Sequence, residues 1–372
     1  MSYKLVRPTA NPILITLPAR SGAEPHAAAA RLLVLDGWRA TSILLVLMCH
    51  MLPLGPKRFV INEAAGLAGM SLFFTLSGFL ITINLLKHTD VFAFVVRRLC
   101  RILPLAYTAI VAYLLIQGKD WRFYVAHFLF LVNYLHGYLT PGAGHLWSLC
   151  VEIHFYAFVA VLVLLLGRGG LNWLPLFALG VTAHRVTLGV KSSIVTDVRI
   201  DEILAGATLA LIWAGELGKL ATGGAKVLRL VPLWVWLILF SLSCHPVGGA
   251  SMYLRPYCGA AVVGHTLLSE RQSWWLLRNR GMRYLAEISY ALYVIHPLTM
   301  YGWLGSGGTV EKYLKRPISF ALTFSLAHLS TFHMERHFIA WGKQITRKRT
   351  ARPASIEQVT EKLGWTKKTA WR

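Results

Sequence analysis

Long apolar stretches recur along the chain, and short polar segments rich in Lys and Arg separate them. Each apolar stretch approaches the roughly 20 residues that an α-helix needs to cross a bilayer. The candidates lie at residues 38–54, 66–86, 102–117, 122–138, 145–166, 171–189, 200–214, 229–246, 252–269, 284–304 and 317–340. The pattern therefore predicts an all-α polytopic membrane protein with no sizeable soluble domain.

The basic segments between the apolar stretches indicate how the chain is oriented. Residues 87–101, 271–283 and 343–372 are rich in Lys and Arg, and such segments stay on the cytoplasmic side of a membrane. Eleven crossings cannot keep these segments and the N-terminus inside, whereas ten can if residues 102–138 cross only once. The polar stretch 121–138 is then interfacial or re-entrant. We expect about ten transmembrane helices in an inner or plasma membrane, with both termini in the cytoplasm.

The same pattern divides the chain into three parts. Residues 1–31 contain several prolines and no apolar core long enough for a signal peptide, so we interpret them as a disordered cytoplasmic leader. Residues 32–342 form the transmembrane domain, and residues 343–372 form a basic cytoplasmic tail. The chemistry of the protein must therefore lie among the helices.

The composition agrees with a membrane protein and excludes other classes. Of the 372 residues, 55% are hydrophobic and 15% charged, whereas about 25% charged residues are typical of a soluble domain. This apolar content also excludes intrinsic disorder. The net charge of +22 comes from basic residues beside apolar runs, which favours membrane lipid over nucleic acid as a partner. The 5 cysteines are isolated, so we expect neither a metal site nor a disulfide.

The first apolar stretch carries Arg39 and His50, and an ionisable side chain within a span is costly enough to indicate function. Eleven positions correspond to a rotation of about 1100°, so the two residues lie within about 20° of the same helix face. Along the axis they are about 16 Å apart, with Arg39 nearer the cytoplasmic end. The alternative is a snorkelling Arg and a hydrogen-bonded core His.

A second polar group opens the fifth apolar stretch. His145, Ser148 and Glu152 are spaced i, i+3 and i+7, so they share one helix face. Glu152 lies too far into an apolar helix to be a solvated end charge, and it needs a partner such as His50 or Arg39. The alternative is an ion pair that only holds two spans together.

Other signals are weaker. Arg97, Arg98 and Arg101 form a basic edge just before an apolar stretch, where such residues set the topology or bind phosphates. His296 directly precedes a proline, near the inner end of its stretch. Gly78 is expected to let two helices approach closely. The supporting candidates for the site are Asp36, His145, Ser148, Arg199, Asp201 and His296.

Six motifs in the chain occur together in one order. They are LDGWRATSILLVLMCH, FFTLSGFLIT, RRLCRILPLAY, HLWSLCVEIHFY, RIDEILAG and ISYALYVIHP. With these motifs, residues 31–340 resemble the acyltransferase-3 family of integral membrane O-acyltransferases. Two positions depart from the family pattern: Ile153 and His154 stand where Glu-Gln is usual, and the segment 335–337 stands where Glu-x-Pro is common. The departures concern the acceptor more than the class of reaction.

The resemblance implies roles for individual residues. Arg39 and His50 take the positions of the signature pair for acyl transfer, and Glu152 that of the glutamate in the tryptophan–serine motif. Arg39 would hold a donor phosphate or polarise the thioester carbonyl. His50 would act as a general base or carry the acyl group, and Glu152 would orient His50. The acyl donor is expected to bind Arg97, Arg98 and Arg101.

The resemblance also implies an activity. The expected reaction moves an acyl group, acetyl in the first instance, from cytoplasmic acyl-CoA to a hydroxyl of a saccharide or surface glycan. Acyl-CoA is then a co-substrate, and no bound cofactor is expected. The alternative is a proton-coupled transporter of an anionic or sugar solute, which would use the same intramembrane Arg, Glu and His. The chain lacks the internal repeat of many transporters, which favours the enzyme.

Overall fold

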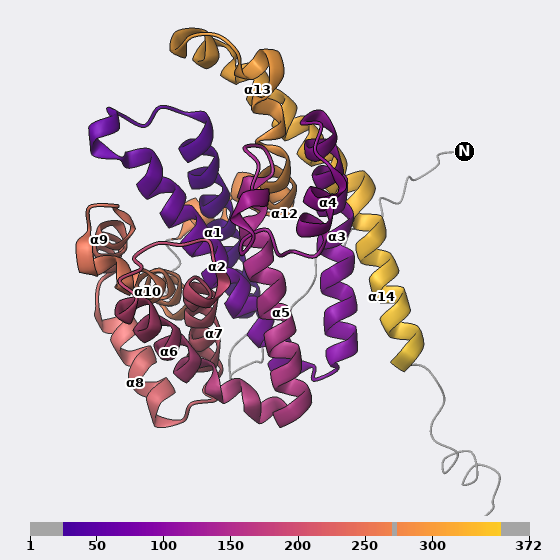
Figure 1. The fold of residues 1–372 in the computed structure, drawn as a ribbon. Helices are drawn as coiled ribbons and strands as arrows, with labels where there is room; N and C mark the ends of the chain where they lie inside the picture. The colour runs from indigo at the N-terminus through magenta and orange to yellow at the C-terminus, as the bar shows by residue number, and fades with distance from the viewer. Residues whose placement is uncertain (1–24, 270–273, 351–372) are drawn as a thin grey trace, which may run out of the picture.

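The computed structural model describes residues 25–269 and 274–350 (Figure 1). These residues form helices, turns and loops without a β-strand, which confirms the all-helical class. The α-helices are α1 (Pro25–Met51), α2 (Ile61–Lys87), α3 (Val91–Ile116), α4 (Trp121–Phe128), α5 (Trp147–Leu166), α6 (Leu174–Thr187), α7 (Asp201–Ala214), α8 (Lys219–Leu230), α9 (Leu233–Cys244), α10 (Arg255–Leu268), α11 (Trp275–Arg278), α12 (Arg280–Ile295), α13 (Thr309–Leu329) and α14 (Arg336–Thr350). Most of the expected leader 1–31, and the tail beyond residue 350, lie outside the described residues.

Four helical segments are long and apolar enough to cross a membrane: Leu33–Met51 of α1, α2, α3, and Gly144–Leu166, which contains α5. Two further pairs, α7 with α8 and α9 with Gly249–Leu268, pass the same test together but bend by 103° and 113° at the break. The described residues thus hold four candidate spans, or up to six if each bent pair is one span. The expected count of about ten crossings is not confirmed.

Several of the other apolar stretches form α-helices that are too short to cross a membrane alone. Three of them, α6, α7 and α10, have 14 residues each, or about 21 Å, against a hydrocarbon core of about 30 Å. Hydropathy cannot separate a crossing helix from one buried inside the protein, because both are apolar. In the segment 121–138, α4 has only 8 residues and is too short to cross.

Helices α1 and α2 lie at the centre of the molecule, and α2 touches α7 at backbone distance (Figure 1). A Cβ atom on Gly78 of α2 would lie 1.9 Å from the carbonyl oxygen of Ile203. A Cβ atom on Gly206 of α7 would lie 2.0 Å from the carbonyl oxygen of Thr75. The two glycines therefore allow a contact that is typical of helices in membranes, and the prediction for Gly78 is confirmed.

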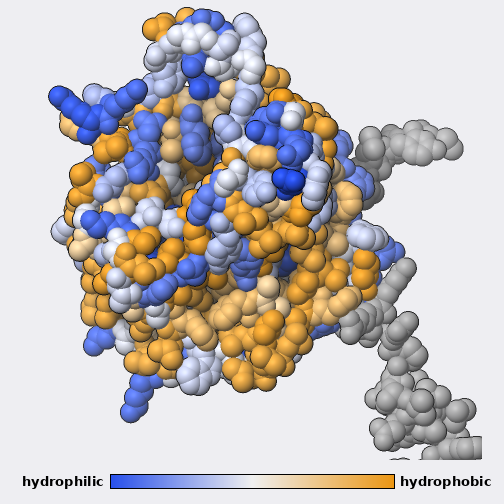
Figure 2. All heavy atoms as spheres, viewed as in Figure 1, coloured by the Kyte–Doolittle hydropathy of each residue, from blue (hydrophilic) through white to orange (hydrophobic). Residues whose placement is uncertain are grey.

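The surface of the molecule also fits a membrane. Hydrophobic residues cover most of the lower half of the face shown in Figure 2, and hydrophilic residues gather towards the end that carries α4 and α13. The last turn of α5 leaves Leu164 and Leu165 70% and 76% exposed. Such apolar exposure is unfavourable in water and has no such cost in lipid.

The two ends of the molecule are defined by contacts at either end of α3. Near its start, Nε of Arg97 donates to Oγ1 of Thr346 in α14 at 3.0 Å, so the α2–α3 connection and the C-terminal end of α14 lie together (Figure 1). Near its other end, the Tyr113 hydroxyl accepts a hydrogen bond from the backbone N–H of Leu298 at 3.0 Å. We call the end with Arg97 and Thr346 the basic end, and the end with Tyr113 and Leu298 the histidine end.

Candidate active site

His50 and His296 form a direct pair at the histidine end. His50 lies in the last turn of α1 and His296 directly follows α12. Nδ1 of His50 lies 2.9 Å from Nε2 of His296, and the two rings stack with centroids 5.0 Å apart. His296 is fully buried, whereas the side chain of His50 is exposed. The pair therefore presents one accessible imidazole, that of His50.

The hydrogen bonds of His296 determine where the protons of the pair lie. Its Nδ1 is 2.7 Å from the carbonyl oxygen of Tyr293, and a carbonyl only accepts, so this nitrogen carries the proton. In the neutral ring Nε2 of His296 then holds the lone pair, and it accepts the Nδ1 proton of His50. Nε2 of His50 is left with a free lone pair. His50 is therefore arranged to accept a proton from a bound molecule.

Tyr113 of α3 fixes the end of α12, where His296 lies. Pro297 lacks a backbone N–H and interrupts the helix at this point. The N–H of Leu298 donates to the Tyr113 hydroxyl, which in turn donates to the carbonyl oxygen of Val294 at 2.9 Å. The hydroxyl is thus inserted into the hydrogen-bond ladder of the helix. The place of His296 is set by α3 as well as by α12.

His145 and Ser148 are joined to the end of α12 through Tyr293. The Tyr293 hydroxyl donates to the carbonyl oxygen of His145 at 2.5 Å and lies 2.6 Å from Oγ of Ser148. The ring of His145 is edge-on to that of His296, with centroids 5.3 Å apart. The start of α5 is therefore fastened to α12 one turn before His296.

A narrow crevice lies beside the α1 stripe that joins Arg39 to His50. It is lined by Arg39, Ser42, Ile43, Val46, Met70, Phe73, Ser289 and Tyr293. The four α1 residues have the spacing of one helix face, and the next position on that face is His50. Its volume is about 10 Å³, which is room for about one water molecule. The crevice therefore lies between Arg39 and Tyr293, on the face of α1 that also carries His50.

Arg98 and Arg101 lie within electrostatic range of Arg39, which lines one end of the crevice. The charges that act on Arg39 are those of Arg101, Asp36, Arg98 and Glu152. Within the described part of the chain, no hydrogen bond or ion pair ties Arg39, Arg98 or Arg101 to another residue. Neighbouring guanidinium groups with free N–H donors are suited to a phosphate or another polyanion.

The arginines of the expected basic edge do not all point in one direction. Arg97 is exposed and points towards α14, where it binds Thr346. Arg98 instead lies over the ring of Tyr156 at 5.8 Å, on the side of α5. Residues 97 and 98 diverge because consecutive helical positions point about 100° apart. These residues lie inside α3 rather than before it, since Asp90 caps the helix by accepting from the N–H of Ala93 at 2.9 Å.

Glu152 does not contact His50, which corrects the expectation that it orients this ring. Its Oε1 accepts hydrogen bonds from Oγ of Ser77 and from the hydroxyl of Tyr156, each at 2.5 Å. In this segment it is His145 that lies beside the histidine pair. Glu152 lies nearly two helical turns further along α5, so its side chain is too far from His50 to contact it. The expected interaction with Arg39 is present as a charge interaction.

Two other expectations about position are corrected. We expected His296 near the inner end of its span, but it lies with His50 at the far end of α12 from Arg280, which begins that helix. Arg199 and Asp201 lie in a separate buried cluster and contact neither histidine. The structure therefore brings His50, His145, Ser148 and His296 together, and gathers Arg39, Asp36, Arg98, Arg101 and Glu152 as a second group.

Sequence reasoning missed the tyrosines and one serine of the site. Tyr293 lies three residues before His296, and this helical spacing could have indicated a shared face. Tyr113 and Tyr156 carry no such signal, because their partners come from other helices. Ser77 donates a hydrogen bond to Glu152, a partner that the sequence does not indicate. Among the described residues, no group of His, Cys, Asp and Glu side chains could hold a metal ion.

The chain is similar to several proteins that are named as O-acetyltransferases. A protein of Staphylococcus aureus (strain COL) named "Putative O-acetyltransferase SACOL0978" is 26% identical over 314 residues, which cover 70% of this chain and 49% of that protein. The peptidoglycan O-acetyltransferase OatA of Listeria monocytogenes serovar 1/2a is 29% identical over 221 residues, 48% of this chain and 33% of the relative. The O-acetyltransferase OatA of Staphylococcus aureus (strain NCTC 8325 / PS 47) is 30% identical over 214 residues, 48% of this chain and 34% of the relative.

The chain spans about half the length of the first of these relatives and a third of the other two. No solved structure matches it. The family model described as "Acyltransferase domain" matches residues 32–331. The apolar helices fit a membrane protein, and the match covers most of the chain. The chain belongs to the acyltransferase-3 family.

Proposed function

We propose that the protein transfers an acyl group, acetyl in the first instance, from cytoplasmic acyl-CoA to a hydroxyl of a saccharide or surface glycan. The observation that carries the proposal is the pairing of His50 with buried His296, which leaves Nε2 of His50 free to accept a proton. Family membership favours acyl transfer over the transporter alternative. The name of the Listeria relative, a peptidoglycan O-acetyltransferase, supports a saccharide acceptor.

The acyl donor binds at Arg39, Arg98 and Arg101. Arg98 and Arg101 hold the CoA phosphates, because their guanidinium groups lie within electrostatic range of that of Arg39 and lack other hydrogen bonds among the described residues. Arg39 is about 16 Å from His50 along α1, so it does not polarise a carbonyl that reacts at His50. We therefore assign Arg39 to the phosphate end of the donor.

The flexible pantetheine arm of the donor follows the crevice between α1, α2 and α12. The crevice is about 10 Å³ and must widen to admit the arm. Its walls are mainly apolar side chains, among them Ile43, Val46 and Phe73, which suit a thin and largely uncharged chain. The thioester then lies between Tyr293 and the histidine pair.

The acceptor hydroxyl reacts at His50. Nε2 of His50 takes the hydroxyl proton as the oxygen attacks the thioester carbonyl carbon. The carbon–sulfur bond breaks, and the departing CoA thiolate takes up the proton from His50. His296 acts as a positioning residue, because its Nε2 accepts the Nδ1 proton of His50 and stabilises the imidazolium that forms.

The proposed activity is tested in membrane vesicles that contain the protein. The vesicles receive acetyl-CoA labelled in the acetyl group and a saccharide acceptor prepared from bacterial envelopes. The expected result is release of CoA together with transfer of the label into the saccharide fraction. Uptake of saccharide without release of CoA would support the transporter instead, and the proposal would be wrong.

Replacing His296 by Asn is expected to lower kcat at least about tenfold, because His50 loses the acceptor that fixes its tautomer. The KM for acyl-CoA should stay unchanged, since His296 lies at the opposite end from the arginines. Steady-state kinetics on inserted protein measure both constants. A rise in KM with an unchanged kcat would show that His296 serves binding rather than the orientation of His50.

Replacing Arg101 by Gln is expected to raise the KM for acyl-CoA about tenfold or more, since a hydrogen bond to a charged group contributes about 1.5–3 kcal/mol. Arg97→Gln is the matched control, because it removes the same charge from the same helix but points towards Thr346. Donor KM is measured for both variants at low and high salt, where the Arg101 effect should shrink. Equal donor KM values for the two variants would contradict the donor site.

We also propose that the basic end faces the cytoplasm, with an even number of crossings, about ten, and both termini inside. In a variant whose 5 cysteines are replaced by alanine, a membrane-impermeant maleimide should label Lys343→Cys only after cells are permeabilised. Val310→Cys, in the exposed first turn of α13 at the opposite end, should react in intact cells. Labelling of Lys343→Cys from outside would reverse the orientation.

A further inference from the structure

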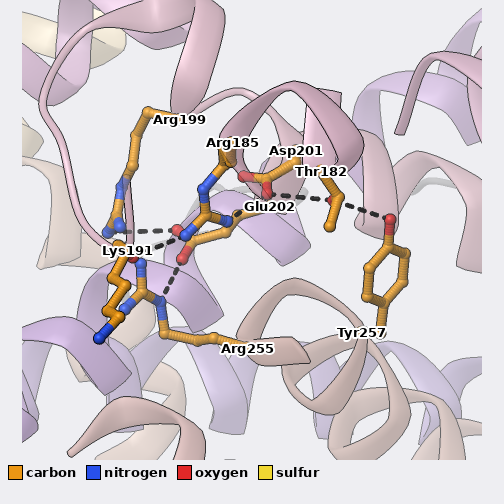
Figure 3. A network of polar contacts seen from close by, with 8 residues as sticks. All are labelled: Thr182, Arg185, Lys191, Arg199, Asp201, Glu202, Arg255 and Tyr257. Carbon is orange, nitrogen blue, oxygen red and sulfur yellow. Dashed lines mark hydrogen bonds and ion pairs between the residues drawn. The ribbon is translucent and has the colours of Figure 1, made fainter. Parts of the chain in front are cut away.

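A second ionic cluster lies buried between α6, α7 and α10, apart from the histidine pair. Figure 3 shows the guanidinium groups of Arg185, Arg199 and Arg255 around the carboxylates of Asp201 and Glu202. Each of these five side chains is at most 2% exposed. The reaction proposed for His50 uses none of them.

The cluster holds more positive than negative charge. Arg185 donates to Oδ2 of Asp201, and Nε of Arg255 donates to Oε1 of Glu202 at 2.7 Å. Nη2 of Arg199 lies 3.3 Å from Oε2 of Glu202. The charges that act on Arg199 are those of the other four residues. Three guanidinium groups against two carboxylates leave a net charge of +1.

Many donors of the cluster have no hydrogen-bond partner within the described part of the chain. These nitrogens are Nε of Arg185, Nε and Nη1 of Arg199, and Nη1 and Nη2 of Arg255. Only two acceptors are left over, Oδ1 of Asp201 and Oε2 of Glu202. Pairing among these atoms cannot satisfy the donors, because the unpaired nitrogens outnumber the unpaired oxygens.

An uncompensated charge at this depth is unfavourable. Burying an ion costs several kcal/mol unless an opposite charge accompanies it. The ring of Trp147 lies under Arg199 at 5.4 Å and that of Tyr253 under Arg185 at 5.6 Å, and such faces attract cations but bring no negative charge. Water could satisfy the N–H groups without neutralising the charge. A ligand that does both must be an anion.

We propose that this cluster binds one monovalent anion. The geometry of Arg255 indicates the chemical class, because its Nε already binds Glu202 while Nη1 and Nη2 remain free side by side. A guanidinium edge of this kind matches the two oxygens of a carboxylate. The anionic group is therefore a free carboxylate or halide ion, or a carboxylate carried by a substrate.

The bound anion would also stabilise the start of α5. Arg199 lies over Trp147, the first residue of α5, and Ser148 follows directly. Ser148 contacts Tyr293, which precedes His296 by one turn. Neutralising the charge of the cluster therefore stabilises the first turn of α5. This turn carries Ser148, which contacts Tyr293 close to His296. This inference goes beyond acyl transfer and does not depend on it.

The test is the thermal stability of the purified full chain in nanodiscs. The reference buffer anion is HEPES, whose charged group is a sulfonate rather than a carboxylate or halide, and ionic strength is held constant while acetate, chloride or glucuronate replaces it. Acetate or chloride is expected to raise Tm by about 3 °C or more in a saturable way, since a ligand of the folded state stabilises it. Stronger stabilisation by glucuronate would identify a substrate carboxylate, and stabilisation by the small ions alone a free ion. A Tm that is the same in all four anions would overturn the proposal.

A matched pair of variants locates the effect. The buried Cys244 lies within electrostatic range of Arg255, Glu202 and Arg199. Cys244→Asp supplies the missing negative charge from the protein itself, so its Tm should no longer depend on acetate or chloride. Cys244→Ser has a similar size and no charge, so it should respond as the unmodified protein does. A Cys244→Asp variant that still responds fully would show that the anion binds elsewhere, which also overturns the proposal.

Discussion

Replacing His50 by Ala is expected to lower acyl transfer by about 10²–10⁴-fold, the range that one general base contributes. The reason is that Nε2 of His50 is the accessible nitrogen of the histidine pair and carries a free lone pair. His145 and His296 cannot replace it, because both nitrogens of each ring are engaged with carbonyl oxygens or with the neighbouring histidine. The measurement is the initial rate of labelled acetyl transfer per inserted protein molecule.

Cys49→Ala is the matched control for this loss. Cys49 precedes His50 on α1 but packs against Gly66 of α2, so its thiol points away from the histidine pair. This variant should retain normal abundance and normal transfer. A His50→Ala protein that is inserted and transfers acetyl at nearly the normal rate would remove His50 from the mechanism.

Replacing Gly78 by Val is expected to prevent the native fold. A Cβ atom there would lie 1.9 Å from the carbonyl oxygen of Ile203 and 2.9 Å from the backbone N of Ala207, and backbone atoms cannot move aside as a flexible side chain can. Overpacking a core typically costs about 1–3 kcal/mol, and a direct backbone clash exceeds that range. The monodisperse fraction after purification and the Tm measure the loss.

Gly180→Val in α6 is the control, because a Cβ atom at this helical glycine meets nothing within 4 Å. It should leave the fold intact, since Val has a better helix propensity than Gly. Equal yields of the two variants would show that the α2–α7 contact tolerates separation. The reciprocal contact at Gly206 would then not require a glycine either.

The sequence predicts those parts of the fold that depend on a single helix. Apolar length located the spans that contain α1, α2 and α5, and helical spacing placed Arg39 and His50 on one stripe. The same reasoning recognised Gly78, since glycine has one evident use in an apolar helix. The count of crossings could not be predicted, because buried helices such as α7 and α10 are as apolar as crossing ones.

The partners of the site residues depend on which helices meet, and one sequence does not contain this information. His296 is 246 positions from His50, and only the packing of α1 against α12 joins them. The expectation that Glu152 meets His50 was wrong, because a shared helix face with His145 does not place the two residues at the same depth in the bundle. Arg97 and Arg98 are neighbours in the sequence but contact different helices, because consecutive helical positions point about 100° apart.

The most direct test of the histidine pair is a double-mutant cycle on acyl transfer. The values of kcat/KM are measured for His50→Ala, His296→Asn and the double variant, each checked for insertion. If His296 acts through His50 alone, the double variant should be no slower than His50→Ala, because residues that act as one unit are not additive. Independent losses that multiply in the double variant would contradict the pair and separate His296 from the chemistry of His50.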